Sequence, residues 1–239
     1  MSSNIYKNKK PLFFFLIPAF LFMLIFLYYP FIQNIFNSFQ EIRGLGTAPM
    51  GWKDPWYSNF KTMWEDENMR IALKNTLIMI LVTIVGQVGI ALFLAILVDN
   101  VKHGSKFFRV VFFFPIVVSA TALGLLFNLI FLYDKGMINQ LLEVLGSKSL
   151  TDWKDETHAF MTMMIPVTWQ YVGFYFIILV TGLNNISDEL YEAAAIDGAT
   201  TLQKVRFITI PLVHNVICTC VILAVTGALK VFDLPWVMF

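Results

Sequence analysis

The sequence has few cysteines and no excess of charge of either sign. Its 239 residues include two cysteines, and 17 lysines and arginines nearly balance 16 acidic residues, for a net charge of +1. A near-neutral chain has no basic surface for nucleic acid, so we expect no nucleic-acid partner. Cys218 and Cys220 lie two apart in an apolar run, where a helix points them in different directions. We therefore predict buried thiols instead of a disulfide or a metal pair.

Motifs for nucleotide binding and for intramembrane catalysis are also missing. No GxxxxGK[ST] phosphate loop occurs, since "GSKS" from Gly146 lacks both the spacing and the Gly-Lys step. There is no HExxH motif, no GxSxG motif and no pair of intramembrane aspartates. The sequence thus predicts that the chain is no enzyme on its own, with no catalytic, cofactor-binding or metal-binding residues.

Apolar residues gather instead into long runs. The chain is 58% hydrophobic and 14% charged, with a mean hydropathy of +0.70. About 20 apolar residues cross a bilayer as a helix, and five runs have this length. We therefore predict an all-α membrane protein, a polytopic helical bundle forming a single transmembrane domain over residues 1–239. The expected spans are residues 11–32, 76–98, 110–133, 160–183 and 208–229.

None of the five runs contains an aspartate or a glutamate. Ion-coupled transporters usually carry an ionisable group at membrane depth, because that group binds the coupling ion. An ion-coupled secondary transporter is therefore the less favoured alternative.

Positive residues near the ends of the runs predict the orientation. Lysines and arginines at 7–10, 102–109 and 204–206 would lie in the cytoplasm if the N-terminus does. Their density favours a multi-pass protein with a cytoplasmic N-terminus without compelling it, so the inverted topology stays open.

The polar linker over residues 184–207 predicts two short helices. Ser187 suits the N-cap of the first, Gly198 suits a left-handed end, and Thr200 or Thr201 can cap the second. Leu190, Ala193 and Ala194 would share a face on which another protein's backbone can approach closely. An amphipathic connector lying on the bilayer surface is the alternative.

The spacing of this linker resembles a known motif. Glu192-Ala193-Ala194, three residues, Gly198, nine residues and then Ile208-Thr209-Ile210-Pro211 is similar to the EAA loop of permease subunits of bacterial ATP-binding-cassette importers, with Ile210 replacing a leucine. In that family the loop forms a coupling helix on the cytoplasmic ATPase. The resemblance implies an ATPase-coupling role for Glu192, Ala193, Ala194, Asp197 and Gly198. We expect Glu192 and Asp197 to fix the helix by local hydrogen bonds and salt links.

The whole chain, through stretches such as "FFRVVFFFP" and "AAIDGA", resembles sugar-type permeases of the maltose and glycerol-phosphate kind. That resemblance implies the type I importer permease fold in a bacterial cytoplasmic membrane. It implies four partners: a second homologous permease, two ATPase subunits holding ATP and Mg, and an extracellular solute-binding protein that delivers the sugar. The family fold has six core helices, so we expect the sixth to be truncated or to lie outside this sequence. A non-sugar solute is an alternative that the sequence leaves open.

Aromatic and polar residues in the fourth and fifth spans are the candidate substrate pathway. Aromatic rings with amide or hydroxyl groups suit a sugar's apolar face and hydroxyls, and the resemblance places these positions near the family's translocation cavity. Packing within the bundle is the alternative for the aromatic residues, and location at the membrane interface is the alternative for Lys230. The candidates are Trp169, Gln170, Tyr171, Phe174, Tyr175, Thr226 and Lys230.

Overall fold

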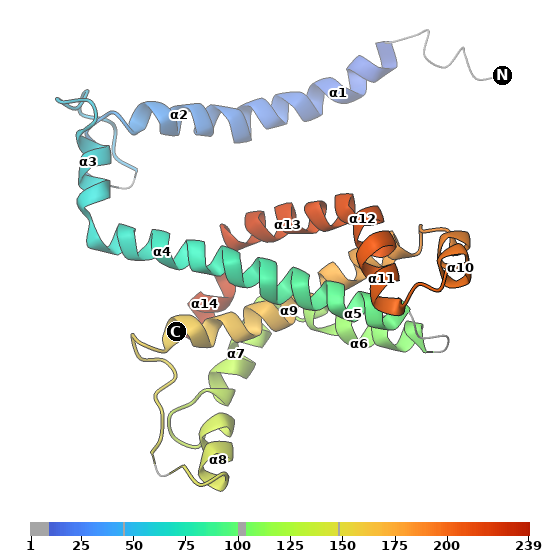
Figure 1. Ribbon diagram of the computed structural model, residues 1–239. Helices are drawn as coiled ribbons and strands as arrows, with labels where there is room; N and C mark the ends of the chain where they lie inside the picture. Colours follow the sequence, from blue (N-terminus) through green and yellow to red (C-terminus); the bar gives the residue numbers. More distant parts are fainter. Residues whose placement is uncertain (1–9, 45, 100–103, 148) are drawn as a thin grey trace. The chain divides into compact units, whose positions relative to one another are not determined.

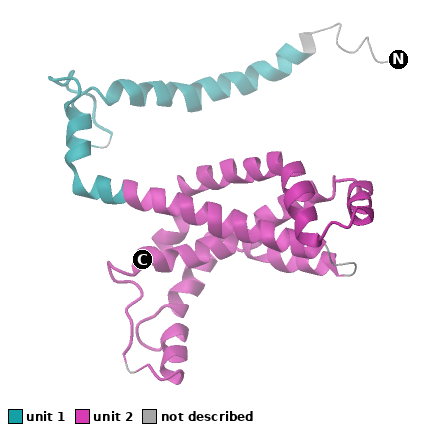
Figure 2. Ribbon diagram, in the orientation of Figure 1, with its two compact units in different colours: residues 1–72 teal, residues 73–239 magenta. Residues whose placement is uncertain are grey.

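The computed structural model describes residues 10–239 except residue 45, residues 100–103 and residue 148. The described residues form helices joined by loops, and their β-pairing is limited to one antiparallel bridge between Gln40 and Trp52 (Figure 1). The chain divides into two compact units, residues 1–72 and residues 73–239 (Figure 2).

The first unit contains one long apolar helix. Residues Leu12–Asn37 run on as a helix of 26 residues, which is long and apolar enough to cross a membrane. It extends five residues beyond the predicted span 11–32. After it, the Asn59 side-chain amide donates to the carbonyls of Ser38 at 2.9 Å and Gln40 at 3.0 Å. The elements of this unit are α1 (Lys10–Met23), η1 (Leu24–Tyr28), α2 (Tyr29–Asn37), α3 (Ser58–Glu65) and the start of α4 (Glu67–Val82).

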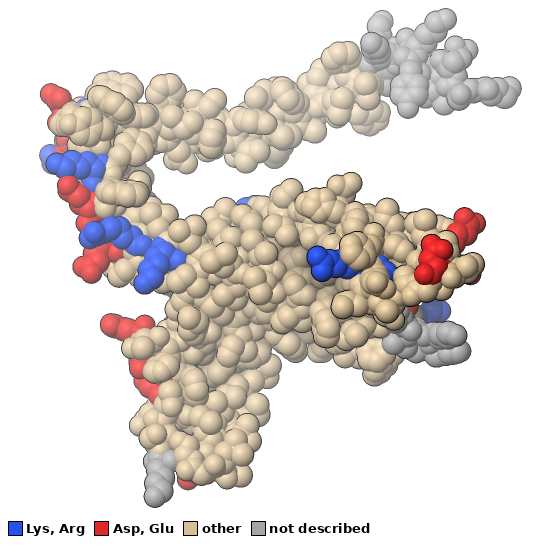
Figure 3. All heavy atoms as spheres, viewed as in Figure 1, with Lys and Arg blue, Asp and Glu red and all other residues tan. Residues whose placement is uncertain are grey.

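The second unit is a helical bundle with short elements at both ends. In the view of Figure 3 much of its surface is free of charged side chains, and acidic side chains gather around α10. Its elements after α4 are η2 (Thr83–Gly89), α5 (Ile90–Asp99), α6 (Ser105–Val117), α7 (Ala120–Ile130), α8 (Met137–Val144), α9 (Ala159–Leu183), α10 (Asp188–Ile196), α11 (Thr201–Lys204), η3 (Val205–Thr209), α12 (Ile210–Leu212), α13 (His214–Ala228) and α14 (Asp233–Met238).

Helix α9 lies at the centre of this bundle and packs against η2, α5, α6 and α13. Lipid tails are as apolar as leucine, so helices in a membrane associate through close packing, and small residues allow the backbones to approach. Ala91 and Ala95 are fully buried beside Phe176 and Leu179 in one core cluster. A Cβ added at Gly173 would collide with the backbone carbonyl of Phe112. Small residues therefore set the close contacts of α9 with α5 and α6.

Two of the predicted spans are bent. Where the sequence predicts one span over 110–133, α6 and α7 meet at 91°, and where it predicts one over 208–229, the chain bends by 67° between Leu212 and His214. At the first bend Ser119 starts a new helix, because its Oγ accepts a hydrogen bond from the Ala122 N–H at 3.2 Å. Helices Glu67–Asp99 and Ala159–Leu183 are each long and apolar enough to span, and they contain the predicted spans 76–98 and 160–183 in full.

Asn139 organises the segment between α7 and α9. This buried side chain donates to the carbonyls of Tyr133 at 3.0 Å and Thr151 at 2.9 Å, and its Oδ1 accepts from the Trp153 indole at 2.9 Å. One amide thus satisfies several backbone and side-chain groups and joins the two sides of the segment.

Candidate functional site

The linker after α9 folds into the capped helix pair α10 and α11. Ser187 caps α10, since its Oγ accepts a hydrogen bond from the Glu189 N–H at 3.3 Å. Thr200 and Gln203 form a reciprocal box at the start of α11. The Thr200 Oγ1 accepts from the Gln203 N–H at 3.3 Å, and the Gln203 Oε1 accepts from the Thr200 N–H at 2.7 Å. The predicted caps at Ser187 and Thr200 are confirmed.

Gly198 ends α10 in the left-handed conformation, with φ +77. The Gly198 N–H donates to the Ala195 carbonyl at 3.1 Å, and the Ala199 N–H donates to the Ala194 carbonyl at 2.9 Å. These two bonds form a Schellman motif, which satisfies carbonyls at the end of the helix. The predicted left-handed glycine is confirmed, and it lets the chain reverse from α10 into α11.

The surface of this pair carries exposed apolar side chains. Ile196 is 86% exposed and Leu202 is 77% exposed. On α10 the side chains of Leu190, Ala193 and Glu192 are exposed too. Large exposed apolar residues beside acidic ones are typical of a surface that binds another protein.

Glu192 and Asp197 make no local links in the described part of the chain. Both side chains are exposed, and the ion pairs found there are Arg43 with Glu41, Lys61 with Glu65 and His158 with Asp155. The expectation that they fix α10 by local hydrogen bonds or salt links is therefore not met. The Ser187 cap and the Gly198 turn hold the helix instead, which leaves both carboxylates open to a partner.

A cavity of about 250 Å³ with both polar and apolar lining residues, which we call the polar cavity, lies inside the bundle. Gln87 borders it from η2, and its side-chain amide donates to the Val167 carbonyl at 3.0 Å. Gln170 borders it from α9 and donates to the Val118 carbonyl at 3.5 Å. Amide, phenol and hydroxyl groups that face one cavity can bind the hydroxyls of a solute. Its polar lining residues are Thr83, Gln87, Gln170, Tyr171, Tyr175, Lys230 and Asp233.

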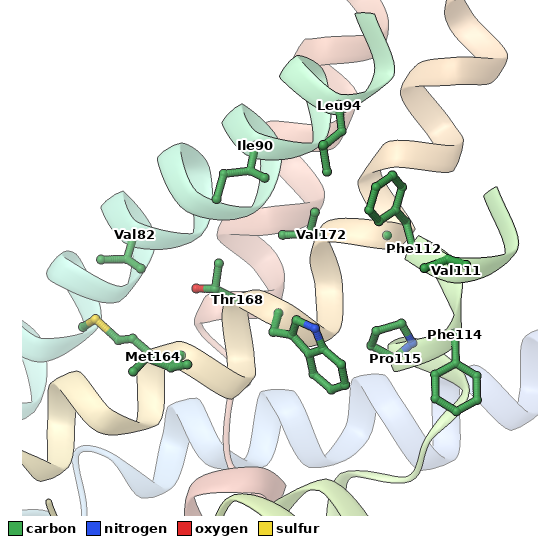
Figure 4. Close-up of a pocket in the computed structure, with 13 residues that line it drawn as sticks. Val82, Ile90, Leu94, Val111, Phe112, Phe114, Pro115, Met164, Thr168 and Val172 are labelled. Atoms are coloured by element: carbon green, nitrogen blue, oxygen red, sulfur yellow. The ribbon is translucent and has the colours of Figure 1, made fainter. Parts of the chain in front are cut away.

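A second, larger cavity of about 820 Å³ is apolar (Figure 4). Val82, Ile90 and Leu94 lie on one side of it, and Phe112 and Pro115 lie on the other. Of the labelled lining residues, Thr168 alone carries a side-chain hydroxyl. Such a wall offers a sugar too few hydrogen-bonding groups to replace its water, so we place the candidate solute site in the smaller polar cavity.

Residues 88–239 match the family of binding-protein-dependent transport system inner membrane components. The chain belongs to this family. It is 34% identical over 238 residues to the probable ABC transporter permease protein YurN of Bacillus subtilis (strain 168). This match covers 97% of this chain and 80% of the relative. It is 31% identical over 222 residues to the lactose transport system permease protein LacF of Rhizobium radiobacter, which covers 92% of this chain and 72% of that relative.

A solved structure shares the fold of this permease. It is a bacterial ABC transporter involved in the import of the acidic polysaccharide alginate, matched with a TM-score of 0.78 and 23% identity over 96% of this chain and 78% of the matched chain. The predictions of an all-α importer permease fold and of membership in the ABC permease family are confirmed.

The permease separates the residues predicted for the substrate pathway into groups. Gln170, Tyr171, Tyr175 and Lys230 border the polar cavity. Trp169, one residue before Gln170, borders the apolar cavity instead. Neighbouring residues of a helix point in different directions, so one short stretch of α9 serves both cavities.

The other two predicted residues lie outside the polar lining. Phe174 is half-buried against the core, with its ring centroid 5.2 Å from that of Tyr175. Thr226 is exposed, and its hydroxyl donates to the Ile222 carbonyl of its own helix at 2.7 Å. As substrate contacts, all seven residues stay predictions.

Sequence reasoning missed Thr83 and Gln87. Both are buried in η2, a π-helical stretch of the second apolar run, and both line the polar cavity. The available signal was Gln87 itself, because an amide at membrane depth is costly unless it has a partner or a function. Short π-helical insertions of this kind often occur at functional sites.

The two cysteines differ in exposure. Both are free thiols; Cys220 is buried and Cys218 is exposed. The prediction of buried thiols is right for Cys220 and wrong for Cys218, whose Sγ lies 3.4 Å from the His214 Nε2 one turn earlier. The described residues contain no group of three or more His, Cys, Asp or Glu that could hold a metal ion.

Proposed function

We propose that this permease is one of two membrane subunits that form the pathway of an ATP-driven importer for a sugar or an oligosaccharide. Similar chains carry names of this kind: a lactose system permease, arabinooligosaccharide system permeases and a multiple sugar-binding system permease. The amide and phenol groups of the polar cavity agree with a solute rich in hydroxyls.

The observation that carries the proposal is the exposed, doubly capped helix pair at one end of the bundle. In our proposal α10 binds one of two ATPase subunits, which hold the ATP and Mg. Glu192, Ala193, Asp197 and Gly198 supply the docking surface and its turn, and Ala194, which is half-buried, lies at the margin of that surface. Leu190 and Ile196 add exposed apolar area on the same helix, and a buried apolar centre ringed by charges is the usual anatomy of such contacts.

The proposed orientation places α10 and the N-terminus in the cytoplasm of a bacterial cell. A solute-binding protein then delivers the sugar from outside. For the alginate transporter, a structure in complex with an alginate pentasaccharide-bound periplasmic protein is known. A second, homologous permease completes the pathway in our proposal.

The test is affinity purification of the tagged chain from its native membranes in mild detergent. We expect an ATPase subunit and a second permease to copurify, and ATP hydrolysis to rise when a sugar-loaded binding protein is added. A chain that purifies alone and moves solute under an ion gradient would contradict the proposal.

A further inference from the structure

We propose that the hydrogen bond between Tyr191 and Thr209 transmits the orientation of α10 to the bent helix that lines the polar cavity, and that Tyr191 and Thr209 are positioning residues for coupling. This role rests on the proposed function, because it assumes that α10 docks on an ATPase. The two hydroxyl oxygens lie 2.9 Å apart and join residues 18 positions apart in the sequence.

Tyr191 is an inward-facing member of an exposed helix. On α10 the side chains of Tyr191 and Ala194 are half-buried, and the other seven residues are exposed. The caps at Ser187 and Gly198 act within the linker, whereas the Tyr191 hydroxyl reaches a different element. The phenol therefore gives α10 a directional attachment to the bundle.

Thr209 is a buried anchor, with 4% of its surface exposed. It ends the π-helix η3, and its Oγ1 also lies 3.4 Å from the Lys204 carbonyl. A carbonyl only accepts, so the Thr209 hydroxyl donates to the Lys204 carbonyl and accepts a hydrogen bond from the Tyr191 phenol. Both partners of the link are thus oriented, and loss of either hydroxyl leaves the other group short of a partner.

The backbone of Thr209 continues the connection into the bend. Its carbonyl accepts a hydrogen bond from the Val213 N–H at 3.0 Å. Val213 is the residue at which the helices Thr201–Leu212 and His214–Ala228 meet at 67°. One residue therefore contacts α10 through its side chain and the bend through its carbonyl.

The helix beyond the bend reaches the candidate solute site. Helix α13 packs against η2 and α9, and Ala224, Gly227 and Ala228 on it line the polar cavity. A different cavity, of about 310 Å³, lies at the hydrogen bond itself. It is bordered by Tyr191 and Thr209 together with Asp99, Asp188 and Lys204. Since Tyr191 and Thr209 both border this cavity and are hydrogen-bonded to each other, a tilt of α10 acts on Thr209 through that bond.

The experiment uses the full chain assembled with its permease and ATPase partners in nanodiscs. ATP hydrolysis is measured before and after addition of the binding protein, loaded from a mixture of lactose and arabinooligosaccharides. We expect Tyr191→Phe and Thr209→Val each to lower the stimulation about threefold to tenfold, as expected for one lost hydrogen bond, while the ATPase subunit stays bound. Thr209→Ser, which keeps the hydroxyl, should retain the stimulation.

The double variant Tyr191→Phe/Thr209→Val should be no worse than either single one, because both remove the same bond. Thr181→Val is the matched control, since the Thr181 hydroxyl donates within its own helix to Ile177 at 2.8 Å. Wild-type stimulation in both single variants, additive losses in the double variant, or loss of the ATPase subunit would overturn this role. A wild-type complex without an ATPase subunit would overturn the proposed function itself, which separates the two failures.

Discussion

Helices α9 and α10 follow one another in the chain, but α9 is held by packing against other helices and α10 by the hydrogen bonds at its own ends. Helix α9 has a buried core side, in which Phe176 and Leu179 are fully enclosed and Gly173 touches the backbone of α6. Helix α10 has no buried residue in the described chain and is shaped by its own ends, at Ser187 and Gly198. The bundle around α9 sets the shape of the cavities, and in our proposal α10 presents a surface for another protein.

The comparison teaches that the same kind of substitution has different consequences in the two helices. A glycine in α9 is needed because a neighbouring backbone lies against it, so its replacement changes packing and stability. The glycine after α10 is needed for its φ angle, so its replacement changes the direction of the chain and then the docking of a partner.

The largest expected effect is that of Gly173→Val. The new side chain would meet the Phe112 carbonyl, so α6 must move away from α9, and we expect a loss of about 3 kcal/mol in the free energy of unfolding. Thermal unfolding in detergent measures it. Gly227→Ala is the control, because nothing lies within 4 Å of a Cβ there. Equal unfolding temperatures for the wild type and Gly173→Val would contradict the packing account.

Gly198→Val comes second and should act on coupling more than on folding. A β-branched residue is strained at φ +77, at a cost of about 1–2 kcal/mol, so we expect roughly tenfold less solute uptake and a smaller fall in unfolding temperature than in Gly173→Val. Gly198→Asn tolerates the left-handed conformation and should keep most uptake. Full uptake by the valine variant would show that the turn is not needed.

Gln170→Ala should have a smaller effect, confined to the solute. Removing one amide from the polar cavity should raise the sugar concentration for half-maximal uptake about fivefold, as expected for one lost hydrogen bond, and leave ATPase binding unchanged. Ile165→Val in the wall of the apolar cavity is the matched control. If both variants transport alike, the polar cavity is not the solute site.

Ser187→Ala should have the smallest effect. The loss of an N-cap costs a helix about 1 kcal/mol, but the Gly198 turn and the Tyr191 contact remain. We therefore expect about a twofold fall in ATPase subunit retained at limiting concentration, measured by quantitative copurification. The control Thr181→Val should retain the wild-type amount of ATPase subunit. If Ser187→Ala lost as much ATPase subunit as Gly198→Val does, the cap alone would hold α10.

Local features of the linker could be predicted from the sequence because they depend on a few neighbouring residues. Ser187 and Thr200 accept hydrogen bonds from backbone amides two or three positions ahead. Gly198 can adopt the left-handed conformation that ends α10 because it has no Cβ. The long helix around α9 was equally clear, since its apolar length carries the signal.

The bends and the division into cavities could not be predicted in this way. Ser119 and Val213 lie inside the apolar runs that predict single spans, and hydropathy reports the length of a run and not its direction, so the breaks at 91° and 67° could not be read from it. The separation of Trp169 from Gln170 depends on how α9 is rotated against η2 and α6, which packing between distant segments decides. The same holds for Gln87, whose partner lies 80 residues away.

The most direct test of the account is photocrosslinking from α10 in the assembled complex. A photoreactive amino acid at Ile196, which is 86% exposed, should crosslink to the ATPase subunit. The same photoreactive amino acid at Val144 on α8, which is 84% exposed, should not crosslink to the ATPase subunit, because our orientation places α8 outside the cell. Crosslinks from Ile196 to the ATPase support α10 as its docking helix; an ATPase that copurifies with the chain and crosslinks from Val144 but not from Ile196 would contradict it.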